Sequence, residues 1–238
     1  MLYGSGFGLY TPTDQLYFYG VLLLAVIGVI ASARVQSAFR KYSSLPAASG
    51  LTAAQVAERL LFRGSGDTKL TRVSGSLTDH FDPRSNTVGL SDEVYDKTSV
   101  AALAVAAHEI GHVMQYQEGY GPIRLRNAVL PVARIGSSVA PWLVLLGVML
   151  GFYQLASFGA WLFAGILLFQ LVTLPVEFNA SRRAIAMLAE GGYLAPGEEE
   201  RAARRVLRAA AMTYVVAALS TFLTFLRLLS LSNRARRR

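Results

Sequence analysis

Two histidines and a glutamate at metal-ligand spacing are the residues of this chain with the clearest chemistry. They form the stretch His108-Glu109-Ile-Gly-His112. A helix has about 3.6 residues per turn, so His108 and His112 would lie on one face and both imidazoles could reach one zinc ion. Glu109 would lie beside the metal, which suits a general base that takes a proton from an attacking water. The pattern therefore predicts a catalytic zinc site.

The residues around this stretch favour a helix. The segment 99–117 is rich in Ala, Leu, Val and Met and contains no proline and one glycine. The chain has three histidines, and two of them occupy this spacing. Glu109 lies in an otherwise apolar run, where a carboxylate without a partner would be costly to bury. These features favour a metal site over histidines that merely pack in a core.

A third ligand must come from another part of the chain, because catalytic zinc is usually held by three protein side chains and a water. Glu177 is the first charged residue after a long apolar run. Ionisable groups at such boundaries are either solvated or functional, and we interpret Glu177 as the third ligand. Glu118 and His80 are weaker alternatives. Glu118 lies more than a helical turn beyond His112, and His80 reads most simply as a strand histidine.

Composition indicates a membrane protein with a small polar domain. The 238 residues are 53% hydrophobic and carry a net charge of +8. Cysteine is absent, which excludes disulfides and thiolate zinc ligands. The basic residues cluster beside apolar segments, as is typical of the cytoplasmic side of membrane proteins. We therefore expect a lipid bilayer as partner and no nucleic acid.

The apolar segments predict the topology. Residues 1–16 are expected to be a short external N-terminus and 17–33 a first transmembrane helix, because Arg34, Arg40 and Lys41 follow it. Residues 135–176 are expected to form a transmembrane hairpin of two helices. A fourth hydrophobic helix is expected at 209–231, interrupted by Arg227, before a basic tail at 232–238. This helix could be re-entrant or interfacial, although we favour four spans.

The remaining segments would lie in the cytoplasm. Residues 34–134 are expected to form the zinc-peptidase domain, and 177–208 a segment with the third ligand and a surface helix. A capping box at Thr52 and Gln55 predicts a helix to about residue 62. Strands are predicted at 70–73, 76–78 and 86–90, with a turn at 82–86. The predicted fold class is a mainly α integral membrane protein with a small α+β catalytic domain, which contains a short β-hairpin or a three-stranded sheet.

Three stretches carry a resemblance to a known family. The chain resembles the bacterial membrane-bound neutral zinc metallopeptidases often called YugP-like. The stretches are Phe81-Asp82-Pro83-Arg84-Ser-Asn86-Thr-Val-Gly-Leu90-Ser91, Ala106-Ala-His108-Glu109-Ile-Gly111-His112 and Pro175-Val-Glu177-Phe-Asn179-Ala-Ser181-Arg182-Arg183. The resemblance covers essentially the whole chain. It implies a bacterial membrane protein. Together with the charges beside the apolar segments, it leads us to expect a multi-pass protein of the bacterial inner membrane with its active site facing the cytoplasm.

More distantly, the layout resembles the membrane heat-shock proteases and prenyl-protein endopeptidases. These are gluzincins, whose third zinc ligand is a glutamate on a later helix, and the resemblance implies this role for Glu177. Their later motif is Glu-x-x-x-Asp, and Ser181 occupies the aspartate position here. Asn179 and Ser181 are therefore both candidates for orienting a zinc-binding imidazole. Arg182, Arg183 and His80 are candidates for stabilising the transition state.

Substrate is expected to bind by strand addition. The residues expected to form an exposed edge strand are Asn86, Thr87, Val88, Gly89 and Leu90. A strand of this kind flanks the active-site helix in gluzincins, so the resemblance implies the same docking mode.

The expected function is a zinc-dependent endopeptidase with one zinc per chain, acting on protein or peptide substrates near the cytoplasmic membrane face. A non-catalytic membrane interaction module stabilised by zinc is the main alternative, although a structural site has no need of Glu109. A transporter is less favoured, because the apolar hairpin carries no charge that would mark an ion path.

Overall fold

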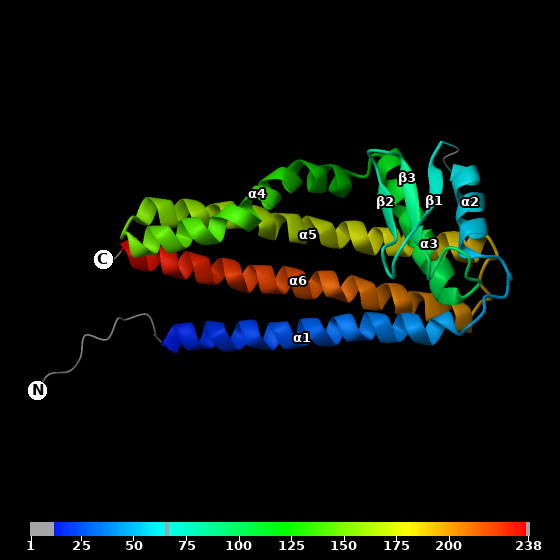
Figure 1. Cartoon of the computed structure of the whole chain (residues 1–238), viewed down its shortest axis with the longest axis horizontal. Coiled ribbons are helices and arrows are strands. Elements are labelled where there is room, and N and C mark those ends of the chain that lie inside the picture. Colours follow the sequence, from blue (N-terminus) through cyan, green and yellow to red (C-terminus); the bar gives the residue numbers. More distant parts are fainter. Residues whose placement is uncertain (1–11, 65–66, 237–238) are drawn as a thin grey trace, which may run out of the picture. The chain divides into compact units, whose positions relative to one another are not determined.

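The computed structural model describes residues 12–64 and 67–236, and most of them are helical. The expected external segment 1–16 lies mostly outside the described residues, as does the end of the basic tail. In chain order the elements are α1 (Pro12–Ser43), α2 (Ala53–Gly64), β1 (Lys69–Val73), β2 (His80–Asp82), β3 (Thr87–Ser91), α3 (Val100–Gln117), α4 (Gly121–Met149), α5 (Tyr153–Glu190) and α6 (Glu198–Arg236) (Figure 1).

The predicted fold class is confirmed: the chain is mainly α, with a small three-stranded mixed sheet. The helices α1, α4, α5 and α6 are each long and apolar enough to cross a membrane. They extend beyond the limits expected from hydropathy. For example, α1 continues to Ser43, and α5 continues through Glu177 to Glu190.

Two compact units divide the chain, and each is described by itself. We call Ala31–Ala128 with Val172–Tyr214 the sheet unit. We call the described residues of Met1–Ile30, Val129–Leu171 and Val215–Arg238 the apolar unit. The long helices α1, α4, α5 and α6 each contribute residues to both units.

The sheet has the order β1-β3-β2, with β3 parallel to β1 and antiparallel to β2. This order contradicts the prediction that Asn86, Thr87, Val88, Gly89 and Leu90 form an exposed edge. Thr87–Leu90 belong to the central strand, where pairing on both sides uses the backbone groups, and Val88 and Leu90 are fully buried. In the described part of the chain, the edge strands are β1 and β2.

The second strand in chain order, β2, also differs from its predicted position. It lies at His80–Asp82 rather than 76–78, although the turn before β3 is at the predicted place. The residues before β2 form a tight loop instead, in which Gly75 and Leu77 have positive φ angles of 109° and 54°. The Thr78 hydroxyl donates to the Ser74 carbonyl across this loop. Alternating polar and apolar residues suggested a strand here, but these backbone conformations are incompatible with one.

The capping box predicted for α2 is confirmed. The Thr52 amide donates to Gln55 Oε1 at 3.0 Å, and the Gln55 amide donates back to Thr52 Oγ1 at 3.2 Å. Two amides of the first helical turn are satisfied in this way. The apolar face of α2 packs on α3 in the core of the sheet unit, and α3 also contacts β2 and β3.

In the apolar unit, helices approach closely through glycines. A Cβ atom placed on Gly159 would lie 2.9 Å from the Ala140 carbonyl oxygen, and one placed on Gly136 would lie 2.9 Å from that of Leu162. Small residues at such contacts are typical of helices that pack in membranes.

A charged pair also belongs to the apolar unit. Arg227 Nη1 lies 3.4 Å from Asp14 Oδ1, and the Arg227 guanidinium lies over the Tyr17 ring. Asp14 is buried. The arginine that interrupts the fourth apolar segment therefore has a carboxylate partner on α1, which lowers the cost of its charge.

Candidate metal centre

Two candidate ligands lie on α3, which starts with a well-formed cap. Ser99 has an extended backbone, and its hydroxyl accepts a hydrogen bond from the Ala102 amide at 3.3 Å. The helix that follows has mostly buried residues on several faces. His108 and His112 lie one turn apart, with ring centroids 4.7 Å apart and an interplanar angle of 84°. Both rings can therefore present a nitrogen to the same point.

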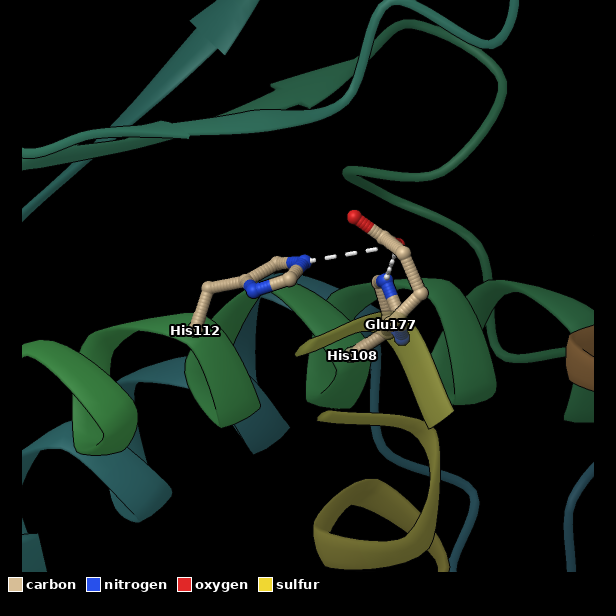
Figure 2. Close-up of side chains that lie close together, drawn as sticks. All are labelled: His108, His112 and Glu177. Atoms are coloured by element: carbon tan, nitrogen blue, oxygen red, sulfur yellow. Dashed lines mark ion pairs between the residues drawn. The ribbon is translucent and has the colours of Figure 1, made fainter. Parts of the chain in front are cut away.

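Glu177 on α5 completes the group. Its Oε2 atom lies 3.4 Å from His108 Nε2 and 3.8 Å from His112 Nε2 (Figure 2). The three side chains are largely buried, with exposed fractions of 16% for His108, 12% for His112 and 5% for Glu177. The structure thus brings together His108 and Glu177, which are 69 positions apart in the sequence.

A glycine makes this meeting possible. A Cβ atom on Gly111 would lie 2.7 Å from the carbonyl oxygen of Ala180 and 3.1 Å from its Cα. These are backbone atoms of α5, which cannot rotate away as a side-chain tip could. Only glycine at position 111 allows α3 to lie this close to α5. Gly111, which directly precedes His112, therefore helps to bring the two histidines to Glu177.

The donor set fits zinc. One ligand atom from each of the three residues lies within 4.8 Å of the others. Two imidazoles and one carboxylate are a common set for catalytic zinc, which keeps a further position for water. The pKa of His112 is consistent with a cation at this position. Burial alone would lower the pKa of His112, but the nearby carboxylates of Glu177 and Glu109 more than offset it and raise that pKa. A metal ion would take the place of that proton.

Glu109 faces a cavity beside the three ligands. The cavity has a volume of about 210 Å³, and His108, Glu109 and Glu177 all line it. Glu109 is buried, and burial raises the pKa of its carboxyl group while the histidines nearby partly counter this. A carboxylate with a raised pKa next to a metal position is suited to accept and return a proton.

Sequence analysis did not select most of the other residues that line the cavity, and three of them matter for its chemistry or its shape. They are Leu77 and Asp79 from the loop before β2, and Tyr214 from α6. The Asp79 carboxylate accepts hydrogen bonds from the Ser91 amide and hydroxyl, which ties the loop to β3. Burial raises the pKa of Asp79, and these hydrogen bonds partly counter the rise. No local pattern marks these residues, because their position depends on how distant segments pack.

The Nδ1 atoms of His108 and His112 have different partners. Ser181 Oγ lies 3.3 Å from His108 Nδ1, so this sequence candidate does meet a histidine. His112 Nδ1 lies 3.0 Å from Gln115 Oε1, a residue that sequence analysis did not select. Asn179 contacts Gln115 rather than either imidazole. The signal for Gln115 was its spacing, because a residue three positions after His112 lies on the same helix face.

The other sequence candidates do not line this cavity. Arg183 forms a two-pronged ion pair with Glu118, at 2.7 and 2.6 Å, and this pair lowers the pKa of the Glu118 carboxyl group. Glu118 is thereby engaged away from the ligands. Arg182 is exposed. His80 is exposed at the start of β2, with its Nδ1 atom 2.8 Å from the Thr78 carbonyl oxygen.

Comparison with known proteins identifies the family of this chain. Residues 17–233 match the family described as "Putative neutral zinc metallopeptidase". The chain is 44% identical over 209 residues to the "Putative membrane protease YugP" of Bacillus subtilis (strain 168). The aligned residues cover 87% of this chain and 92% of that protein. No solved structure matches the chain. The length of the family match and the identity to this relative together establish that the chain belongs to the neutral zinc metallopeptidase family so described.

Proposed function

We propose that this protein is a zinc-dependent endopeptidase of the membrane, with one zinc per chain held by His108, His112 and Glu177. The observation that carries the proposal is the convergence of these three side chains beside a cavity that is lined by the buried Glu109. Membership of a zinc metallopeptidase family supports it, and the relative from Bacillus subtilis is named as a membrane protease.

The residues divide the chemistry between them. Bound zinc would supply a Lewis acid that activates water and polarises the peptide carbonyl. Glu109 accepts the proton of the attacking water and delivers it to the leaving amine. The mostly apolar wall of the cavity keeps bulk water from the carboxylate, which strengthens its electrostatic interaction with the reacting groups.

The substrate chain is proposed to lie along β2. Its outer edge is unpaired within the described residues, whereas β3 is paired on both sides. The helix α3 contacts β2, and the loop that precedes β2 contributes Leu77 and Asp79 to the cavity. An extended peptide added to this edge would pass beside the candidate site. The proposed docking strand is therefore residues 80–82, in place of residues 86–90.

The proposed location is the cytoplasmic face of the bacterial inner membrane. Support comes from the charges that follow the first apolar segment, namely Arg34, Arg40 and Lys41. Four apolar helices support a multi-pass protein. With the first span leading inward, the sheet unit would face the cytoplasm, where basic residues are enriched.

Substitution of the proposed base tests the function. Glu109→Gln removes the carboxylate and keeps the size of the side chain. We therefore expect normal zinc content and a rate of peptide hydrolysis that falls roughly 10²- to 10⁴-fold. A quenched-fluorescent peptide library presented to the detergent-purified protein measures the rate. Glu58→Gln, at an exposed position of α2, is the matched control.

The same experiment separates the main alternative. A zinc-stabilised interaction module would hold zinc in the wild type and in Glu109→Gln, with no hydrolysis by either. Hydrolysis at the wild-type rate by Glu109→Gln would refute the proposed role of this residue.

A further inference from the structure

A connected series of polar side chains lies behind His112, on the side away from the candidate metal position. Gln115 Oε1 lies 3.0 Å from His112 Nδ1, and Gln115 Nε2 donates to Asn179 Oδ1 at 2.9 Å. Arg183 Nε donates to the same Asn179 oxygen at 2.8 Å. We propose that Gln115, held by Asn179 and Arg183, is a positioning residue that fixes which nitrogen of the neutral His112 ring carries the hydrogen and directs the lone pair of Nε2 toward the metal.

The polarity of this series is set at its two ends. A backbone carbonyl can only accept a hydrogen bond, and an arginine N–H can only donate one. Gln115 Nε2 donates to the Val176 carbonyl oxygen at 2.8 Å, so the amide nitrogen of Gln115 must face α5. Arg183 gives the same result independently. Its Nε–H donates to Asn179 Oδ1, so this atom must be the amide oxygen of Asn179. Because that oxygen is also the partner of Gln115, the Gln115 atom that contacts it must be the amide nitrogen.

One consequence follows for His112. With both amide hydrogens of Gln115 engaged, only its carbonyl oxygen remains for the imidazole. That oxygen is an acceptor, so Nδ1 of His112 must carry a hydrogen. A neutral imidazole has one N–H, and the lone pair is then on Nε2, which is the atom that lies 3.8 Å from Glu177 Oε2.

His108 differs in this respect. Its Nδ1 atom lies 3.3 Å from the hydroxyl of Ser181. A hydroxyl can donate or accept, so Ser181 is compatible with either form of the ring. The two zinc-binding histidines are therefore unequal, and His112 is the one whose form is imposed by its surroundings.

Burial strengthens the effect of Gln115. This side chain is fully buried, and an amide left without partners there would be costly. Its bond to the Val176 carbonyl joins α3 to α5 at the residue before Glu177. Gln115 therefore fixes both the ring of one ligand and the backbone beside another. The inference deepens the proposed function and rests on it for the identity of the metal.

The direct test is an NMR measurement on the zinc-free protein in detergent. Long-range ¹H–¹⁵N correlation spectra distinguish the two neutral forms of histidine, and the chain has three histidines to assign. His80→Gln and His108→Gln identify the signals. At alkaline pH we expect the wild-type His112 ring to carry its hydrogen on Nδ1. A hydrogen on Nε2 would overturn the inference without any substitution near the site.

Substitutions then measure what the series contributes. Gln115→Met keeps the length of the side chain and removes its hydrogen bonds. We expect a mixture of His112 forms and zinc binding that is roughly 10- to 100-fold weaker in chelator competition. If folded Gln115→Met retained the wild-type form of His112 and the wild-type zinc affinity, the inference would fail.

The contribution of Arg183 has a matched control. Arg183→Gln and Arg182→Gln each remove one positive charge at neighbouring positions of α5, but only Arg183 contacts Asn179. We expect weaker zinc binding in Arg183→Gln, by less than in Gln115→Met because the Val176 carbonyl still orients Gln115, and no change in Arg182→Gln. Equal affinities in the two arginine variants would overturn the part of the inference that includes Arg183.

These outcomes are separate from those of the proposed function. Hydrolysis that depends on Glu109, together with an unchanged His112 in Gln115→Met, would leave the peptidase standing and remove this inference. The expected His112 signals and zinc affinities in a protein without hydrolysis would do the reverse.

Discussion

Two helix contacts built on glycine differ in what surrounds them. At Gly111 in the sheet unit, α3 approaches the backbone of α5 so closely that a Cβ atom would lie 2.7 Å from the Ala180 carbonyl oxygen. At Gly159 in the apolar unit, α5 approaches α4 with a corresponding distance of 2.9 Å to the Ala140 carbonyl oxygen. In both contacts a glycine lets one helix approach the backbone of another. The neighbours of Gly159 are the side chains of Leu143 and Val144, whereas Gly111 lies between two candidate zinc ligands.

Close packing of helices serves two purposes in this molecule. Around Gly159, the close approach brings apolar side chains into contact, as expected for helices that pack in a membrane. Around Gly111, closeness also lets polar groups meet across the helices, including the hydrogen bond from Gln115 to the Val176 carbonyl. Buried polar groups are stabilising only when their partners are in reach, so the sheet unit depends on the exact separation of its helices.

The largest expected effect comes from adding one methyl group at each contact. Gly111→Ala and Gly159→Ala should each lower the free energy of unfolding by roughly 1–3 kcal/mol, the range for overpacking. Gly111→Ala should in addition weaken zinc binding more than about tenfold, because α3 must move away from the helix that carries Glu177. Thermal unfolding and chelator competition on both variants measure these effects.

The zinc measurement decides whether the comparison holds. Gly159→Ala is the control for stability loss alone, and its zinc affinity should equal that of the wild type. If both variants lost zinc equally, the site would depend on general stability and not on the contact at Gly111.

A second prediction concerns the ion pair of the apolar unit. Asp14→Asn removes the charge that Arg227 Nη1 faces at 3.4 Å. Because Asp14 is buried, we expect the free energy of unfolding to fall by roughly 1–3 kcal/mol, the cost of leaving a buried polar group without its partner. Zinc affinity should not change.

An exposed ion pair supplies the reference for that substitution. Asp96→Asn removes a partner of Arg72 on the surface, and surface pairs contribute little. Its unfolding temperature should match that of the wild type. A loss in Asp14→Asn no greater than in Asp96→Asn would contradict a structural role for the buried pair.

The smallest expected effect is on the side of His108. Ser181→Ala removes a hydroxyl at 3.3 Å from His108 Nδ1, a long contact that leaves the form of the ring open. We expect zinc affinity to fall by less than roughly tenfold, and by less than in Gln115→Met. A larger loss in Ser181→Ala would reverse the proposed inequality of the two histidines.

The local parts of the fold could be predicted from the sequence. The spacing of His108 and His112 depends only on helix geometry, and the capping box at Thr52 and Gln55 depends on residues three positions apart. Glu177 was selected from its place after an apolar run, and the structure places it beside the two histidines.

The non-local parts could not be predicted in this way. Residues 86–90 have the pattern of a strand, but whether a strand is central or at an edge depends on which other strands pair with it. The parallel pairing with β1 has no local signature. Tyr214 reaches the cavity from α6, more than 100 residues after the His108 helix turn, and only packing brings it there.

Zinc content is the most direct test of the proposal that His108, His112 and Glu177 together hold one zinc ion. The measurement is zinc per chain in detergent-purified wild type, Glu177→Ala and Glu190→Ala, the last being an exposed glutamate on the same helix. We predict about one zinc in the wild type and in Glu190→Ala, and little or none in folded Glu177→Ala. Full zinc content in Glu177→Ala, or none in a folded wild type supplied with zinc, would contradict the account.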